Sequence, residues 1–317
     1  MKTKEKYTSI GGQAVIEGVM MRGPKKTALA VRNSSGEIEI EELSIKPIKS
    51  KILKAPFIRG TVSFLSSMVI GYKSLEKSAT MSGMDEDLED SEPSKFEKFL
   101  TNKLGDNLFK IIMYISLVIG LLFSVLLFII LPTYTTKFVN FLAGGGIPSF
   151  YLTVIESVIK LTIFLIYLIL VAQMKDIKRV FQYHGAEHKT IFCYEHKMPL
   201  TVENVRTNSR FHPRCGTSFL ILVMLISIAI FMLPIFQWDN LLLRVLTKIA
   251  FLPIVAGFSY EVIRLAGKYE NLFTKIVSAP GLWVQRLTTK EPDDGQIEVA
   301  IASLKAVLED NEESQIV

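Results

Sequence analysis

The chain lacks the features of a secreted, disulfide-bonded protein. Only two of its 317 residues are cysteine, which is too few for a disulfide framework and favours a reducing compartment. The first nine residues, MKTKEKYTS, contain no apolar stretch, so we expect no cleaved signal peptide. An excess of one charge is also missing, because 36 Lys and Arg against 31 Asp and Glu give a net charge of only +5. So small and dispersed an excess predicts no nucleic-acid partner.

Apolar residues, by contrast, are plentiful. They make up 49% of the chain, and the mean hydropathy of +0.34 argues against a purely soluble protein. Charged residues still account for 21%, which is too many for a chain buried entirely in a bilayer. We therefore expect a mainly α-helical membrane protein with a sizeable water-facing part.

Four apolar runs are long enough to cross a membrane as helices. Each contains 20 to 25 residues, and at about 1.5 Å per residue each can cross a hydrocarbon core of roughly 30 Å. The four expected spans are Phe109–Leu131, Leu152–Met174, Thr217–Phe236 and Leu241–Leu265. A fifth run, Gly60–Tyr72, is too short to span and predicts an interfacial or re-entrant segment.

Basic residues predict the orientation of these spans. The connection 132–151 contains Lys137 alone, and the connection 237–240 contains no Lys or Arg. The connection 175–216 contains eight: Lys175, Lys178, Arg179, Lys189, Lys197, Arg206, Arg210 and Arg214. Because cytoplasmic loops carry the positive charge, we expect this loop and both termini to be cytoplasmic, in a multi-pass protein of the plasma membrane.

The pattern predicts four regions along the chain. Residues 1–80 hold the interfacial segment and a cytoplasmic β-hairpin, with strands within Thr27–Asn33 and Glu37–Leu43. Residues 81–106 form an acidic linker, and residues 107–265 form the four-helix membrane domain with its loop 175–216. Residues 266–317 form a cytoplasmic tail with one amphipathic helix after Pro292. Its expected apolar face consists of Ile297, Ala300, Ile301, Leu304, Val307 and Leu308.

All four histidines and both cysteines lie between residues 184 and 215. Within this window, His184, Glu187 and His188 form an H-x-x-E-H array. On a helix, positions i and i+4 share a face, so the two imidazoles can chelate one divalent metal ion while Glu187 acts as a base. His212 and Cys215 follow within one short turn.

This clustering predicts a site for Zn²⁺ or another divalent transition metal, with His184, His188, His212 and Cys215 as ligands. Cys193 is a further candidate, with packing in the loop as the alternative, and His196 is expected at the surface. Glu261 could complete the metal shell as in inverted zincins, or could form a salt bridge with Arg264. Four protein ligands would indicate a structural site and three a catalytic one, and the sequence does not choose.

The segment GGQAVIEGVMMRGP, residues 11–24, is the other dense feature. Its glycines could bring the backbone close to a ligand, although it matches no nucleotide-binding motif. The simpler interpretation is a tight turn and a short buried strand, with an internal ion pair between Glu17 and Arg22.

Four blocks together resemble the YqhQ-like bacterial membrane family: GGQAVIEGVMMRGP, HGAEHKTIFCYE, NSRFHPRCGTSFL and PGLWVQRLTTKEPDDGQIEVAI. The resemblance extends from about Ile10 to Leu308. It implies a membrane protein of unknown reaction that is a predicted metal-dependent enzyme, with the first block folded onto the metal loop. The matching positions are Gly12, Gln13, Glu17, Gly18, Met20, Met21, Arg22, His184, Glu187, His188, His212, Pro213, Arg214, Cys215 and Gly216.

Three functions fit these features. The first is a membrane metallohydrolase acting on a lipid head group or a membrane-protein segment, with Glu187 as base and Arg22, Arg210 or Arg214 as an oxyanion clamp. The second is a non-catalytic, zinc-stabilised scaffold or assembly factor whose C-terminal helix binds a partner. The third is a transporter or channel that uses Glu156, Lys160 and Glu261. The sequence leaves the substrate and the oligomeric state open.

Overall fold

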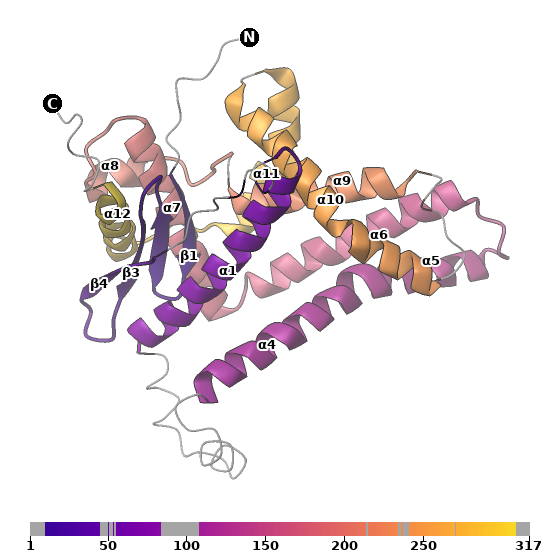
Figure 1. The fold of residues 1–317 in the computed structure, drawn as a ribbon, viewed down its shortest axis with the longest axis horizontal. Coiled ribbons are helices and arrows are strands. Elements are labelled where there is room, and N and C mark those ends of the chain that lie inside the picture. Colours follow the sequence, from indigo (N-terminus) through magenta and orange to yellow (C-terminus); the bar gives the residue numbers. More distant parts are fainter. Residues whose placement is uncertain are drawn as a thin grey trace.

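The structure is a computed structural model that describes residues 10–44, 50, 53, 55–83, 108–213, 215–233, 236, 241–269 and 271–308. Figure 1 shows a β-sheet packed with helices at one end of the molecule, and long helices that extend away from it. Most of the acidic linker expected at 81–106 lies outside the described residues, as do the two chain ends.

The N-terminal region is a four-stranded antiparallel sheet in the order β1-β2-β3-β4. Its strands are β1 (Gly11–Val15), β2 (Gly18–Arg22), β3 (Thr27–Arg32) and β4 (Ile38–Glu42). The expected hairpin, β3–β4, is confirmed, and the glycine-rich block supplies the other two strands as a second hairpin. At its turn, Glu17 adopts a φ of 49°.

Helices cover both faces of this sheet, so its central strands are buried on both sides. Val19 and Met21 of β2 join one apolar cluster, which faces α7 (Lys175–Glu195) and α12 (Asp294–Leu308). Met20 and Leu29 join another cluster with Ile70 of α1 (Ile58–Met81). This alternation follows from the period of two along a strand.

The predicted C-terminal amphipathic helix is confirmed as α12. Five of its six expected apolar positions are buried against β2, β3 and α7, and Leu308 is partly buried: Ile297, Ala300, Ile301, Leu304 and Val307 form the buried set. The expected loop 175–216 begins as the 21-residue helix α7, which is followed by α8 (Val202–Thr207).

The membrane part contains α4 (Leu108–Val125), the π-helical turn η3 (Leu126–Ile130), α5 (Leu131–Leu142), α6 (Ser149–Val171), α9 (Gly216–Phe231) and α10 (Leu241–Lys268). Within the described residues, three helical stretches are long and apolar enough to cross a membrane: 114–142, 149–171 and 245–265. The run expected at Thr217–Phe236 forms a helix of 16 residues, about 24 Å long at the usual rise. The number of four spans is therefore not confirmed.

The first expected span, Phe109–Leu131, is longer in the structure, because the helix does not end at Leu131. The helix continues through Pro132 to Leu142, because the π-helical turn just before the proline adjusts the hydrogen-bond ladder where the proline has no N–H to donate. The Thr133 hydroxyl donates to the carbonyl of Ile129 at 2.8 Å, which satisfies a backbone group next to the proline.

A charged cluster lies between the membrane helices. Glu156 of α6 accepts a hydrogen bond from the Thr133 hydroxyl at 2.8 Å and forms an ion pair with Lys248 of α10. All three side chains are buried. The cluster ties three helices together. It lies near the starts of α5, α6 and α10, so it is at the opposite end of α6 from α7.

Two helices differ from expectation. The interfacial segment expected at Gly60–Tyr72 is longer, because α1 has 24 residues and packs closely on Gly257 of α10 at Gly60. A further helix, α11 (Leu272–Thr288), was not predicted in the C-terminal tail. Asn271 and Thr274 cap its start by bonding each other's backbone N–H groups.

Candidate metal centre

The centre is built on α7, whose i and i+4 positions place His184 and His188 on one face, as the sequence predicted. Gly185 lies between them and allows another part of the chain to cross the helix. A Cβ atom at Gly185 would overlap the carbonyl oxygen of Lys290, and the Lys290 N–H donates to the Phe181 carbonyl at 2.8 Å. The segment after α11 is therefore held against the turn that carries His184.

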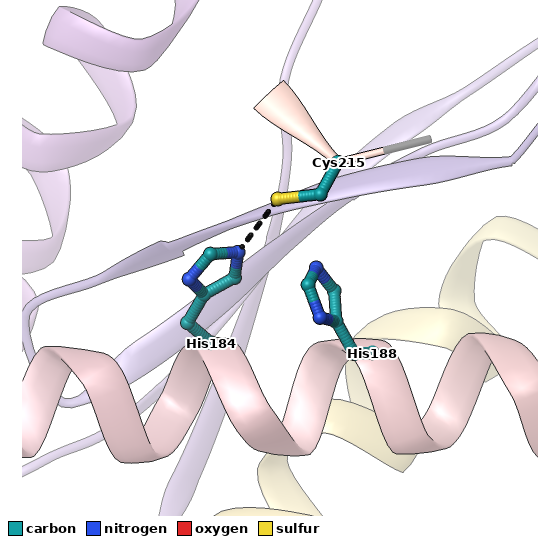
Figure 2. A group of neighbouring side chains, drawn as sticks. All are labelled: His184, His188 and Cys215. Atoms are coloured by element: carbon teal, nitrogen blue, oxygen red, sulfur yellow. Dashed lines mark hydrogen bonds between the residues drawn. The ribbon is translucent and has the colours of Figure 1, made fainter. Parts of the chain in front are cut away.

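Three ligand-type side chains converge at this point. The Nε2 atom of His184 lies 3.1 Å from the Sγ atom of Cys215, and one donor atom from each of His184, His188 and Cys215 lies within 4.8 Å of the other two. Figure 2 shows both imidazoles rising from α7 toward Cys215, which precedes α9. Two neighbouring turns of one helix and the start of another thus form one cluster.

Main-chain carbonyls fix the orientation of both imidazoles. The Nδ1 atom of His184 lies 2.8 Å from the Thr288 carbonyl oxygen, and the Nδ1 atom of His188 lies 2.5 Å from the Arg210 carbonyl oxygen. Because a carbonyl only accepts, each Nδ1 carries the proton, so the Nε2 lone pair of a neutral ring faces the cluster. Metal-binding histidines are commonly held in this way.

Cys215 is the N-cap of α9, and its Sγ accepts a hydrogen bond from the Thr217 N–H at 3.4 Å. Burial opposes ionisation of the thiol, but the nearby imidazoles of His184 and His188 hold its pKa well below the ordinary 9.0. Burial likewise opposes the charge on His184, while Cys215, Glu187 and the Thr288 carbonyl together raise its pKa to about 9. The electrostatics therefore favour a thiolate, the form that binds metals.

Glu187 lies beside both imidazoles and is only 5% exposed. Its Oε2 atom is 3.9 Å from Nε2 of His184 and 4.0 Å from Nε2 of His188. Gly12 of β1 packs against it, since a Cβ at that position would lie 2.7 Å from the Glu187 Cγ. The glycine-rich block thus folds onto α7, which carries the candidate ligands, as the resemblance implied.

The cluster fits a transition-metal ion on the chemistry of its donors. Zinc–nitrogen bonds of about 2.0–2.1 Å and zinc–sulfur bonds of about 2.3 Å place tetrahedral neighbours about 3.4–3.6 Å apart. The three donors, all within 4.8 Å of one another, need only small shifts to reach that spacing. Two imidazoles and a thiolate are ligands that suit zinc better than calcium or magnesium.

His212, the fourth expected ligand, does not join the three-residue cluster. Its N–H donates to Oε1 of Gln285 and its carbonyl accepts from Nε2 of the same side chain, both at 2.7 Å. Its Nε2 atom lies 3.6 Å from Oε2 of Glu195, and its ring centre lies 5.6 Å from that of His188. The structure therefore places His212 next to the centre, in contact with α11.

Cys193 and Glu261, the further candidates, lie in other surroundings. Cys193 is buried in the apolar cluster, its Sγ lies 3.5 Å from the Pro199 carbonyl oxygen, and burial raises its pKa. Glu261 accepts hydrogen bonds from Nε and Nη2 of Arg59 at 2.7 and 2.5 Å, so it joins α10 to α1. The position of Cys193 fits the alternative that it packs in the loop. Glu261 forms an ion pair, as its alternative predicted, but its main partner is Arg59, and the expected partner Arg264 lies 3.9 Å away.

The arginines expected as an oxyanion clamp are not gathered at the centre. Arg22 is exposed at the end of β2, opposite Gly11, and Arg214 lies outside the described residues. The Arg210 guanidinium lies over the ring of Phe211, 5.0 Å from its centre, and this residue contributes its carbonyl to His188.

The expected ion pair between Glu17 and Arg22 is wrong. Glu17 pairs with Arg179 of α7 and accepts a hydrogen bond from the Tyr183 hydroxyl at 3.1 Å. The reason is geometric: Glu17 lies in the turn and Arg22 ends β2, roughly 17 Å away along an extended strand. The turn between β1 and β2 is therefore held against α7, just before the position of His184.

Sequence reasoning also missed Gln285 and the carbonyls of Thr288 and Arg210. A main-chain carbonyl has no signature in a sequence, so the Thr288 and Arg210 contacts could not be read from it. Gln285 does lie in the resembling block PGLWVQRLTTKEPDDGQIEVAI, which was the one available signal.

Comparison with known proteins places the chain in a family. A family model described as "Protein of unknown function (DUF1385)" matches residues 55–310. The chain belongs to this family. It is also 39% identical over 309 residues to "Uncharacterized protein YqhQ" of Bacillus subtilis (strain 168), covering 94% of this chain and 92% of that relative.

The expected YqhQ-like membership is thereby confirmed. Neither description names a metal or a reaction, so the comparisons do not support the metal-dependent enzyme that the resemblance implied. No solved structure matches the chain.

Proposed function

We propose that His184, His188 and Cys215 bind a divalent transition metal, with zinc as the best fit, and that the protein is a metal-dependent hydrolase. One observation carries the proposal: both imidazoles are fixed by backbone carbonyls so that each Nε2 faces the Cys215 thiolate, with the Glu187 carboxylate 3.9 and 4.0 Å from the two Nε2 atoms. Two histidines, one thiolate and an adjacent carboxylate are the parts of a hydrolytic centre.

Three groups have separate roles in this proposal: the bound metal, Glu187 and two backbone carbonyls. A bound metal would supply a Lewis acid that polarises a carbonyl or phosphoryl oxygen and makes water more acidic. Glu187 accepts the proton from the attacking water and returns it to the leaving group, because its carboxylate lies beside the ligands without being one of the three. Thr288 and Arg210 keep the imidazoles in the required tautomer through their carbonyls.

The proposed substrate is a polar group at the surface of the plasma membrane, either a lipid head group or a segment of a membrane protein. Support comes from the position of the centre: α7 starts four residues after α6 ends, and Cys215 directly precedes the apolar helix α9. The basic residues of 175–216 support a cytoplasmic location for the centre, with both chain ends on the same side.

The second candidate is a structural metal centre in a membrane scaffold or assembly factor. Burial favours it: His188 is 1% exposed and Cys215 8% exposed. A metal there would join α7 to α9, and through them the sheet to the membrane helices. A closed structural site and a catalytic one differ in whether a position stays open to substrate.

Glu187→Gln separates the two candidates, because glutamine keeps the size of glutamate and loses its basicity. A deletion strain carrying wild type or Glu187→Gln is scored for complementation, and metal is quantified on protein purified from the same cells. A hydrolase predicts metal near the wild-type level and a fall in function of at least about 100-fold. Full complementation by the metal-loaded variant would remove the hydrolase and favour the scaffold.

A further inference from the structure

One face of helix α11 packs against the candidate metal centre. Gly281, Gln285 and Thr288 are spaced by four and three residues, so they share this buried face. Gly281 lets α11 approach α9, since a Cβ there would lie 2.7 Å from the Ser218 Cα. Gln285 then binds the backbone of His212, and the Thr288 carbonyl binds His184. Movement of this helix would displace both histidines.

The opposite face of α11 exposes large apolar side chains. Leu272, Ile276 and Trp283 are spaced by four and seven residues, so they lie on one side, with Phe273 beside them. Their exposed fractions are 75% for Leu272, 62% for Ile276, 54% for Trp283 and 58% for Phe273. So large an apolar surface is a sign of contact with a membrane or a partner.

Two exposed cations border this apolar face. Lys275 and Arg286 are eleven residues apart, which is close to three turns, so both lie along the same edge. An apolar face with a tryptophan and a basic edge is typical of a helix lying in the plane of a membrane surface. The basic edge also matches the anionic lipids of the cytoplasmic leaflet.

We propose that α11 lies in the head-group region of the bilayer, with Leu272, Phe273, Ile276 and Trp283 in the lipid and Lys275 and Arg286 on anionic head groups. The position of the helix supports this occupant. It begins four residues after the end of α10, which contains a candidate span, and it packs on α9 and α10, which expose apolar side chains of their own such as Leu220 and Phe258.

A second copy of the chain fits this face less well than lipid does. If two copies paired antiparallel through this face, the Lys275 and Arg286 edges of both would lie on the same side and repel each other. Anionic lipid instead supplies the opposite charge along the same edge, which attracts basic residues near the membrane surface. The charge pattern therefore selects the bilayer.

The placement narrows the substrate of the hydrolase proposed above. Because one helix contacts lipid on one face and holds His184 on the other, the centre lies at the depth of the head groups. The substrate class is then a polar group carried by a lipid of the cytoplasmic leaflet. This last step rests on the proposed function, whereas the position of α11 does not.

Fluorescence quenching of Trp283 tests the position directly. Trp238→Phe leaves Trp283 as the single tryptophan of the full-length chain, which is reconstituted in vesicles of phosphatidylcholine and phosphatidylglycerol. We expect lipids brominated near the head group to quench Trp283 at least about twofold more than lipids brominated near the chain end. A control chain with Trp238→Phe, Trp283→Phe and Ile40→Trp carries its tryptophan on β4 and should show little quenching.

Three results would overturn the proposal. Quenching of Trp283 no greater than that of the β4 control would mean that protein or water covers the face. Stronger quenching from the chain end would mean that α11 lies deep in the hydrocarbon. Unchanged quenching after Lys275→Glu with Arg286→Glu would remove the role of anionic lipid. Each measurement is repeated after treatment with a chelator, so that a failure of metal binding does not alter the answer about α11.

Discussion

His184 and Thr288 link α7 to the last residue of α11, through a hydrogen bond of 2.8 Å between the Nδ1 atom of His184 and the Thr288 carbonyl oxygen. The contact orients a candidate ligand, and it exists only because Gly185 lets the chain near Lys290 cross α7. The centre therefore depends on packing between distant parts of the chain as well as on the H-x-x-E-H spacing.

Replacing a cysteine tests the ligand set, because the chain offers a matched control. Cys215→Ser should lower bound zinc by at least about tenfold, since a hydroxyl is a poor replacement for a thiolate ligand. Cys193→Ser, which changes a buried thiol in the apolar cluster, should keep most of the metal. Metal analysis of both purified variants checks this, and equal retention of zinc would show that Cys215 is not a ligand.

Two adjacent glycines of β1 give a second matched pair. Gly12→Ala should destabilise the protein by about 1–3 kcal/mol, because the added methyl group meets Glu187. Gly11→Ala should change stability little, since a Cβ there meets no atom within 4 Å. Thermal unfolding in detergent measures both. Equal stability of the two variants would mean that β1 does not pack on Glu187.

Metal binding should depend on pH through His184. Its pKa is raised from 6.5 to about 9 in the metal-free fold, so its proton stabilises that fold fully below pH 6.5 and ceases to do so as pH rises through about 9. The lowered pKa of Cys215 acts in the opposite sense: its contribution is present above pH 9.0 and is lost as pH falls through the folded value.

A metal must displace the His184 proton, so the affinity for zinc should rise by up to about tenfold per pH unit between about pH 6.5 and 9. Calorimetry at pH 7 in buffers of different ionisation enthalpy counts the protons released. About one proton per zinc is expected. Binding without proton release at pH 7 would contradict a protonated His184 in the metal-free fold.

The buried pair in the membrane helices should be sensitive to removal of one partner. Lys248→Met removes the ammonium group that pairs with the buried Glu156 carboxylate, which should cost about 3–5 kcal/mol. The double variant Glu156→Gln with Lys248→Met should recover much of that loss, because no charge stays buried. Unfolding in detergent tests this, and an additive double variant would show that the pair is not coupled.

Periodic patterns in the sequence predicted part of this structure well. The i and i+4 histidines of α7, the hairpin β3–β4 and the apolar face of α12 all follow from local spacing. Helix α11 was not predicted, because Pro280 and Gly281 interrupt its helical pattern. Gly281 is nevertheless the residue that allows close contact with α9. The ion-pair partner of Glu17 was not predicted either, since Arg179 is far away in the sequence.

The sequence likewise predicted some contacts of the candidate site and missed others. The convergence of His184 and His188 follows from helix geometry, and Cys215 joined them as the sequence predicted. The position of His212 depends on Gln285, 73 residues later, and the imidazole tautomers depend on backbone carbonyls. Such contacts are set by tertiary packing, which local spacing does not encode.

X-ray absorption at the zinc edge, on the purified full-length protein, tests the metal centre most directly. The account predicts one sulfur neighbour at about 2.3 Å and nitrogen or oxygen neighbours at about 2.0–2.1 Å. It also predicts that the sulfur signal disappears in Cys215→Ser and persists in Cys193→Ser. A wild-type protein without tightly bound metal, or with a shell of nitrogen and oxygen alone, would contradict it.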